Sequence, residues 1–140
     1  MNNENPNINT ILFDMSDGLP FNDNSKNIII ADLCLQYFDL SKTKYIFSEI
    51  HRVLKENGYF IARVNSFNDI QILLELKEIE KHYYYDGKIY KRFFDKKDLA
   101  ELFENFKIYS LEEKKMDRYE RPKILWEFCV RKKNNDVKKG

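Results

Sequence analysis

Glycine and proline are scarce in this sequence. The 140 residues include four glycines, at positions 18, 58, 87 and 140, and three prolines. A loop that cradles a nucleotide or a similar cofactor needs closely spaced glycines, because the backbone there must approach the ligand. No two glycines lie within one loop of each other, so we predict that the sequence has no such loop. It also has no Pro- or Gly-rich linker, which indicates a single folding unit.

Cysteine and histidine are also rare, and long apolar runs are missing. Cys34 and Cys129 lie in apolar stretches, and we interpret both as buried thiols. Together with His51 and His82 they show no metal-ligand spacing, so we expect no metal site. No apolar run approaches the ~20 residues of a membrane span, and the N-terminus has no signal-peptide pattern. These features favour a cytoplasmic protein without a membrane role.

The charges are nearly balanced. Lys and Arg number 24 and Asp and Glu number 23, which gives a formal net charge of +1. A basic surface for nucleic acid is therefore not indicated. Hydrophobic residues make up 43% of the chain, which is typical of a folded domain. We expect one domain over residues 10–133, with flexible polar ends at residues 1–9 and 134–140.

The first half of the chain alternates between strand and helix patterns. Residues 11–13 form a short apolar run that predicts a strand. The β-branched run 28–31 predicts a central strand buried on both faces of a parallel sheet. Helical spacing of apolar residues then extends from Ser41, as N-cap, to a stop at Gly58, and residues 59–64 predict the next strand. Strand, helix and strand in this order usually make a right-handed parallel crossover.

The second half carries further helix and strand patterns. Residues 70–79 have a leucine and isoleucine face and predict a helix. The aromatic stretch 83–94 allows no local prediction. Residues 95–106 predict a short amphipathic helix, 107–111 an edge strand, and 124–130 the last strand. The whole pattern indicates an α/β fold.

Two adjoining blocks resemble one known family. They are DMSDGLPFNDNSKNIIIADLCLQYF, at residues 14–38, and SEIHRVLKENGYFIARVNS, at residues 48–66. Both are similar to segments of small-molecule class I S-adenosylmethionine-dependent methyltransferases of type 11, in which an aspartate precedes LPF and an R-V-L-K-x-x-G sequence precedes a strand. The blocks occur in the family's order, and the resemblance extends over about residues 11–131.

The resemblance implies a truncated Rossmann-like methyltransferase sheet. Family members have the strand order 3-2-1-4-5-7-6, with parallel central strands, a C-terminal antiparallel pair and flanking helices. The family's first strand, glycine loop and acidic ribose-binding residue would precede residue 11, so we expect the chain to represent the C-terminal half of such a domain. Residues 25–27, Ser-Lys-Asn, also replace the usual S-F-D of the family.

The resemblance also implies positions for ligands. The family's aspartate before LPF contacts the adenine amino group of S-adenosylmethionine, and the backbone amide of the following residue reaches the ring. The loop after the fourth strand passes the cofactor and the substrate. The corresponding cofactor-binding residues are Asp14, Met15, Asp32 and Leu33, and the substrate-binding ones are Cys34, Gln36 and Tyr37. Asp14 is also an ordinary turn former, and Asp32 and Cys34 also suit a plain strand end.

An aromatic and basic cluster follows between residues 81 and 94. The family often has a substrate lid near this point, which makes Tyr84 and Tyr85 candidate substrate-binding residues. Packing against the core or a partner is the other interpretation. His51 lies beside Arg52 and Lys55, so we expect it on a solvated helix face and not as a catalytic base.

The missing strands would leave an unpaired edge on the strand at residues 28–31, which predicts a protein partner or a homodimer. Residues 11–13 could also shift over to pair there. We consider three functions: a methyltransferase active only with the missing half supplied in trans, a non-catalytic accessory subunit of a true methyltransferase, and a fragment that folds alone and binds nothing.

Overall fold

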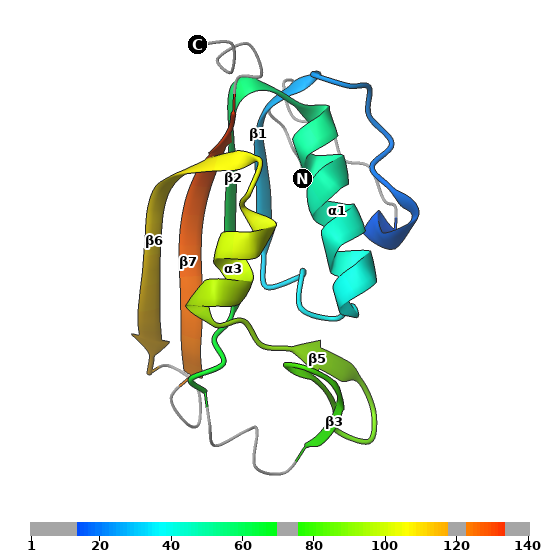
Figure 1. The fold of residues 1–140 in the computed structure, drawn as a ribbon, viewed down its shortest axis with the longest axis vertical. Helices are drawn as coiled ribbons and strands as arrows, with labels where there is room; N and C mark the ends of the chain where they lie inside the picture. Colours follow the sequence, from blue (N-terminus) through cyan, green and yellow to red (C-terminus); the bar gives the residue numbers. More distant parts are fainter. Residues whose placement is uncertain (1–13, 70–75, 118–122, 134–140) are drawn as a thin grey trace, which may run out of the picture.

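Four strands form the central sheet of the computed structural model, which describes residues 14–69, 76–117 and 123–133. The strand order is β1-β2-β7-β6, where β1 is parallel to β2, and β7 is antiparallel to both β2 and β6 (Figure 1). This order confirms the α/β fold, with its parallel strands followed by an antiparallel pair. The bounds are β1 Lys26–Asp32, β2 Leu54–Asn65, β6 Phe106–Met116 and β7 Lys123–Lys132.

The helix between β1 and β2 differs from its prediction at both ends. Helix α1 spans Leu40–Val53, and its N-cap is Asp39, not Ser41, because the Asp39 carboxylate accepts the Lys42 N–H at 2.8 Å. The helix ends before Gly58, which lies inside β2. A Cβ at Gly58 would lie 2.9 Å from the carbonyl oxygen of Lys55, so this position requires glycine for close approach and not as a helix stop.

Phenylalanine rings form the core on one face of the sheet. Phe47 of α1 packs edge-on to Phe60 of β2 at 5.5 Å between ring centroids. Phe103, directly after helix α3 (Lys96–Leu102), packs on Phe128 of β7 at 4.8 Å, and Phe60 also meets Phe128 at 5.3 Å. Both helices therefore cover the same face of the sheet (Figure 1).

Strand β1 is not the doubly buried central strand that the isoleucine run predicted. Ile28 is 54% exposed and Ile30 is 69% exposed, whereas Ala31 is buried against the helices. In the described ranges β1 pairs only with β2, so it forms an edge of the sheet there. Since alternate strand residues point to opposite faces, Ile28 and Ile30 lie on the face that α1 and α3 leave open.

A second, three-stranded sheet lies beyond the carboxyl end of β2 (Figure 1). It contains β3 (Lys77–Glu80), β4 (Tyr83–Tyr85) and β5 (Tyr90–Arg92) in the order β3-β4-β5, all antiparallel. The predicted helix at residues 70–79 is therefore wrong for residues 77–79, because backbone pairing with β4 decides the conformation there. Residues 70–75 lie outside the described ranges.

One further predicted element has different bounds in the structure, and other predictions lie outside the described residues. The short α3 ends at Leu102, so Phe106 begins β6 and does not continue the helix. The predicted strand at residues 11–13 and the predicted flexible ends, 1–9 and 134–140, lie outside the described residues. Among the helices that are described, none has the length and apolarity needed to cross a membrane.

The one-sided core makes a stability prediction. Replacing Phe60, which is fully buried, with alanine leaves a cavity and should lower the free energy of unfolding by about 3–5 kcal/mol in urea titrations. The matched control Tyr109→Ala, at a residue 69% exposed, should cost less than about 1 kcal/mol. Similar losses for the two variants would contradict a core confined to the helix-covered face.

Candidate functional site

The loop after β1 holds the candidate residues Leu33, Cys34, Gln36 and Tyr37, and it starts with a strained backbone. Leu33 has φ 55°, in the left-handed region that a bulky side chain rarely adopts. Its N–H donates to the carbonyl oxygen of Arg63 on β2 at 3.0 Å, which holds this conformation. The chain therefore turns abruptly at the carboxyl ends of two parallel strands, where open α/β sheets bind ligands.

Asp32 makes a two-pronged ion pair with Arg63. The two residues are register partners on β1 and β2, and the oxygens of Asp32 lie 2.6 Å from Nε and 2.8 Å from Nη2 of Arg63. Such paired bonds fix the orientation of the carboxylate. Asp32 shares the parity of Ile28 and Ile30, so it belongs to the open face of the sheet.

Asp14 caps a single 3-10 turn, η1 (Met15–Asp17). Its carboxylate accepts the Ser16 N–H at 3.0 Å and the Ser16 hydroxyl at 2.8 Å, and these bonds lower the pKa of Asp14. Met15 packs partly buried against the core. A hollow of about 290 Å³ lies beside this turn, lined by Asp14, Asp17, Gly18, Leu19, Pro20 and Glu49. Asp14 thus has the turn-forming contacts expected of it and also borders a hollow.

Cys34 is a half-buried free thiol next to Asp32 in the chain. Burial and then the negative charge of Asp32 raise the pKa of Cys34. Cys129 on β7 is also free and half-buried, and burial raises its pKa as well. Neither cysteine is as deeply buried as the sequence predicted, and neither thiol is activated as a nucleophile.

Gln36 and Tyr37 lie where the small sheet contacts this loop. Gln36 is only 4% exposed, its Nε2 donates to Leu33 O at 3.1 Å, and its Oε1 is buried without a hydrogen-bond partner. The Gln36 carbonyl accepts the N–H of Arg92 at 2.6 Å, and the Tyr37 carbonyl accepts the hydroxyl of Tyr83 at 3.2 Å. The hairpin of β4 and β5 is therefore docked on the candidate loop.

Arg92, which sequence reasoning missed, anchors this docking. Its guanidinium is buried, donates from Nε to Phe38 O at 2.9 Å and pairs with Glu80 at 2.5 Å. It also lies 4.9 Å from the centre of the Tyr83 ring, in a cation–π arrangement. Its alternation with tyrosines was the only signal in the sequence, and it did not distinguish a buried arginine from a solvated one.

Tyr84 and Tyr85 point to opposite faces of β4. The Tyr84 ring meets Phe93 at 5.9 Å, and burial raises the pKa of Tyr84. Tyr85 instead packs on Tyr90 at 4.7 Å, and Tyr90 also stacks on Tyr83 at 5.6 Å. Only Tyr85 belongs to the face that carries this stack of tyrosines.

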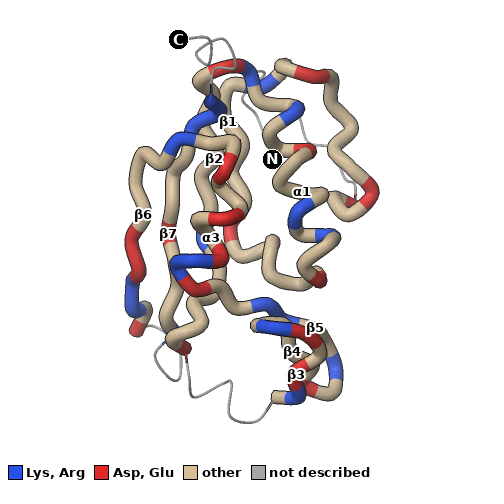
Figure 2. Tube along the Cα trace, in the orientation of Figure 1, with Lys and Arg blue, Asp and Glu red and all other residues tan. Residues whose placement is uncertain are grey.

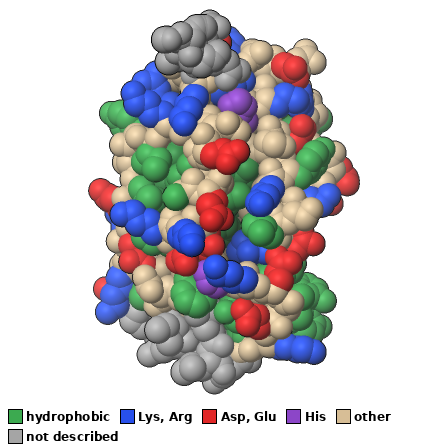
Figure 3. All heavy atoms as spheres, viewed as in Figure 1, with side chains coloured by type: hydrophobic (Ala, Val, Ile, Leu, Met, Phe, Trp, Pro, Cys, Tyr) green, Lys and Arg blue, Asp and Glu red, His purple; other side chains and the backbone are tan. Residues whose placement is uncertain are grey.

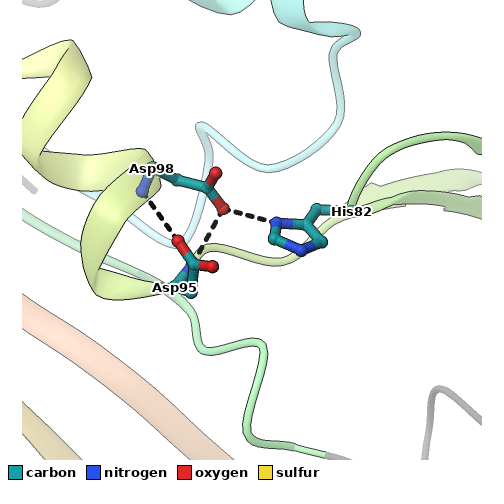
Figure 4. Close-up of side chains that lie close together, drawn as sticks. All are labelled: His82, Asp95 and Asp98. Carbon is teal, nitrogen blue, oxygen red and sulfur yellow. Dashed lines mark hydrogen bonds and ion pairs between the residues drawn. The ribbon is translucent and has the colours of Figure 1, made fainter.

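His82, Asp95 and Asp98 come together although they are distant in the sequence (Figure 4). Their ligand atoms lie within 4.8 Å of one another, and His82 Nδ1 is 2.6 Å from the Asp98 carboxylate. The two aspartates form the capping box of α3, since each carboxylate accepts the backbone N–H of the other residue. The cluster ties the small sheet to the start of α3.

His51 is half-buried, not on a solvated helix face as the sequence predicted. Its ring packs edge-on to Phe106 at 5.3 Å, and burial followed by Lys132 lowers the pKa of His51. A cavity of about 400 Å³ opens beside it between α1 and the turn from α3 to β6, on the face seen in Figure 3. The cavity lies on the helix-covered face, away from the loop after β1.

Basic and acidic residues alternate over the described chain (Figure 2). Beside the candidate loop, the negative charge of Asp32 is paired with the positive charge of Arg63, so this ion pair carries no net charge.

Known proteins share this architecture. Residues 1–62 match the family model described as a methyltransferase domain. Among solved structures, an S-adenosylmethionine-dependent methyltransferase from Methanosarcina mazei is 20% identical with a TM-score of 0.74, over 84% of this chain and 64% of its own. The Burkholderia thailandensis 1,6-didemethyltoxoflavin-N1-methyltransferase, solved with that substrate and S-adenosylhomocysteine, is 16% identical with a TM-score of 0.60, over 80% of this chain and 46% of its own.

The same fold also serves another reaction. The [4+2]-cyclase SpnF is 18% identical with a TM-score of 0.56, over 84% of this chain and 53% of its own. No curated protein matches the chain. The chain therefore spans about half to two thirds of the length of these three solved structures, and the shared fold confirms the predicted resemblance to class I methyltransferase domains.

The raised pKa of Cys34 gives a prediction for alkylation. In a Cys129→Ser background, the rate of reaction with iodoacetamide should reach its midpoint at a pH above that of an ordinary thiol, because only the thiolate reacts. Asp32→Asn should move this midpoint down by removing a repelling charge, but not to the ordinary value, since burial is the larger cause. An unchanged midpoint in Asp32→Asn would contradict the assigned contribution of Asp32.

The anchor at Arg92 makes a second prediction. Arg92→Met keeps the bulk of the side chain but removes the ion pair with Glu80, which retains only the Leu40 N–H, and the donor to the carbonyl of Phe38, and should lower the free energy of unfolding by about 2–3 kcal/mol. The control Lys91→Met removes an exposed pair with Asp86 and should cost less than about 1 kcal/mol. Hydrogen exchange of β4 amides should accelerate only in Arg92→Met; equal exchange would rule out the anchor.

Proposed function

We propose that this chain, which has the fold of the C-terminal part of an S-adenosylmethionine-dependent methyltransferase, forms the substrate-facing part of a methyl-transfer site. The observation that supports this most is the strained turn at Leu33, held against β2 below a docked aromatic hairpin. Strained backbone persists where its surroundings fix it, and it gathers at ligand sites. Here it lies at the carboxyl ends of β1 and β2.

The candidate residues fall into two groups, one around the methyl donor and one around the methyl acceptor. In the proposal the S-adenosylmethionine side of the site consists of Asp14, Met15, Asp32 and Leu33, and the acceptor side of Cys34, Gln36, Tyr37, Tyr84 and Tyr85. Two observations fit this division. The Asp14 carboxylate is exposed beside a hollow and can accept a further donor, and the buried Oε1 of Gln36 has no hydrogen-bond partner.

Bound S-adenosylmethionine supplies an electrophilic methyl group on a sulfonium. The residues of this chain then have to align the acceptor and exclude water, which is enough for large accelerations when the reacting atoms are well placed. Tyr83 and Tyr90 extend the aromatic wall around Tyr85, and Arg92 holds that wall to the loop. A dedicated base is not required when the acceptor is already free of its proton.

We further propose that the site is completed by another polypeptide segment that pairs with β1. The exposed Ile28 and Ile30 and the edge position of β1 in the described residues support this proposal. A partner protein or a second copy can supply the segment. The two free thiols fit a reducing, cytoplasmic setting.

The second candidate is a non-catalytic accessory subunit that docks on a true methyltransferase. The closed ion pair of Asp32 with Arg63 favours it, since that carboxylate already has a bidentate partner. The cyclase with the same fold also shows that this architecture does not imply methyl transfer.

Calorimetric titration with S-adenosylmethionine tests the proposal. The chain is mixed with an N-terminal part of the Methanosarcina mazei methyltransferase, or this part is fused ahead of residue 1. We expect binding by the complemented chain and at least about tenfold weaker binding by the chain alone. Asp14→Ala should weaken binding about tenfold through one lost hydrogen bond to the adenine, whereas the control Asp17→Ala in the same turn should not.

Other outcomes of this titration discriminate between the two functions. A stable complex that binds no S-adenosylmethionine would favour the accessory subunit. Equal binding by the complemented and isolated chains would overturn the need for a completing segment. Equal effects of Asp14→Ala and Asp17→Ala would overturn the assigned adenine contact.

A further inference from the structure

The cavity beside His51 has a size in the range of small-molecule sites, with a volume of about 400 Å³. One wall is a stripe of α1 whose members recur at helical spacing and therefore share one side of the helix: Lys44, Phe47, Ser48 and His51. The other wall consists of residues 101–102 and 104–106, at the end of α3 and in the turn to β6. We call this hollow the α1–α3 cavity. Its lining residues differ from those of the proposed methyl-transfer site.

The buried lining residues of the α1–α3 cavity, Phe47 and Phe106, are aromatic, and beside them lies an unpaired nitrogen. The His51 ring packs edge-on to Phe106 at 5.3 Å, and its Nε2 is buried without a hydrogen-bond partner. Burial and then the charge of Lys132 lower the pKa of His51, so the imidazole is neutral at pH 7. A buried polar atom without a partner costs free energy, which a donor that reaches it would recover.

The exposed lining of the α1–α3 cavity carries more negative than positive charge. Glu101 and Glu104 contribute two carboxylates, Lys44 contributes one ammonium group, and all three residues are exposed. Among the residues that the structure describes, none of these three side chains takes part in an ion pair. Both carboxylates are therefore available to a ligand, and the neutral imidazole of His51 does not offset their charge.

We propose that the α1–α3 cavity binds a small organic cation, an ammonium group carried on an aromatic body. The body packs against Phe47 and Phe106, and the ammonium group lies between the carboxylates of Glu101 and Glu104. An anion of the same size would face two carboxylates and one ammonium group, so it binds less tightly. The cavity lies on the helix-covered face, away from the loop after β1, so this site does not depend on the proposed methyl transfer.

Three probes of one size test the class of ligand. The full chain is titrated with benzylamine, benzyl alcohol and benzoate, and binding is followed by the NMR shifts of backbone amides. Benzylamine should bind with a dissociation constant of roughly millimolar order and shift the amides of residues 44–51 and 101–106. Benzyl alcohol should bind about fivefold more weakly, because ion pairs at an exposed rim contribute little, and benzoate more weakly still.

Two outcomes of these titrations would overturn the proposal. Benzoate that binds as tightly as benzylamine would show that Lys44, and not the carboxylates, selects the ligand. Benzylamine that shifts no amide of either wall at any soluble concentration would show that the cavity is not a site for organic cations. The titrations contain no S-adenosylmethionine, so either result leaves the proposed methyl transfer untouched.

Neutral variants test the two carboxylates. Glu101→Gln and Glu104→Gln should each weaken benzylamine about threefold and leave benzyl alcohol unchanged, because only the ammonium group pairs with them. The control Glu78→Gln, on exposed β3 outside the cavity, makes the same change in net charge and should leave both affinities unchanged. Equal weakening by Glu78→Gln would mean that the net charge of the chain acts, and would overturn the assignment to Glu101 and Glu104.

Filling the cavity tests its position. Ser48→Leu adds bulk at an exposed lining residue of α1 and should abolish binding of benzylamine and benzyl alcohol alike. The control Ser41→Leu changes an exposed serine of the same helix outside the cavity and should bind both probes as the native chain does. A native pattern of amide shifts in the free variants shows that each one folds. A folded Ser48→Leu chain that binds benzylamine as before would overturn the α1–α3 cavity as the site.

Discussion

Burial on one face of the sheet is the constraint on which the rest of the molecule depends. Helices α1 and α3 and the Phe60 and Phe128 rings fill a single layer, and most of the buried apolar side chains of the described strands lie on that side. The free-energy gain from apolar burial is proportional to the area removed from water. The isoleucine-rich strand β1 lies at the edge of this layer, and its side chains Ile28 and Ile30 are therefore exposed to solvent.

The candidate site depends on that layer through two long-range connections. Arg92 holds the small sheet against the loop after β1, because its Nε donates to the Phe38 carbonyl and its backbone N–H donates to the Gln36 carbonyl. His82 holds the same sheet to the start of α3 through Asp98. The hairpin is thus attached at both the strand and the helix layers, which gives the aromatic stack a fixed position relative to Leu33. A small sheet of three short strands needs such anchors, because an isolated hairpin is marginally stable in water.

Similar solved structures include methyltransferases and a cyclase, and the shared architecture does not separate these chemistries. In this chain the loop after β1 combines a strained Leu33, an unactivated thiol at Cys34 and a buried acceptor on Gln36. These groups are suited to positioning a ligand and excluding water more than to proton transfer.

Much of the fold could be read from the chain. The apolar spacing of residues 28–64 predicted strand, helix and strand, because this spacing is a local feature of the sequence. The family resemblance implied the strand order that the structure shows as β1-β2-β7-β6. The candidate loop residues were also found this way, since a loop after a parallel strand is a matter of sequence position. The helix predicted over residues 70–79 was wrong at residues 77–79, because these residues pair through their backbone with β4, and apolar spacing along the chain does not show such a contact.

The sequence by itself determined the alternation of elements, the scarcity of glycine and the balance of charge. Only the tertiary structure decided that Ile28 and Ile30 are exposed, that Arg92 is buried, and that His82 meets Asp98. The physical reason is that burial and ion pairing depend on which distant segments cover a residue. The sequence around a residue shows that residue's own preference for water, but it does not show which distant segment covers the residue.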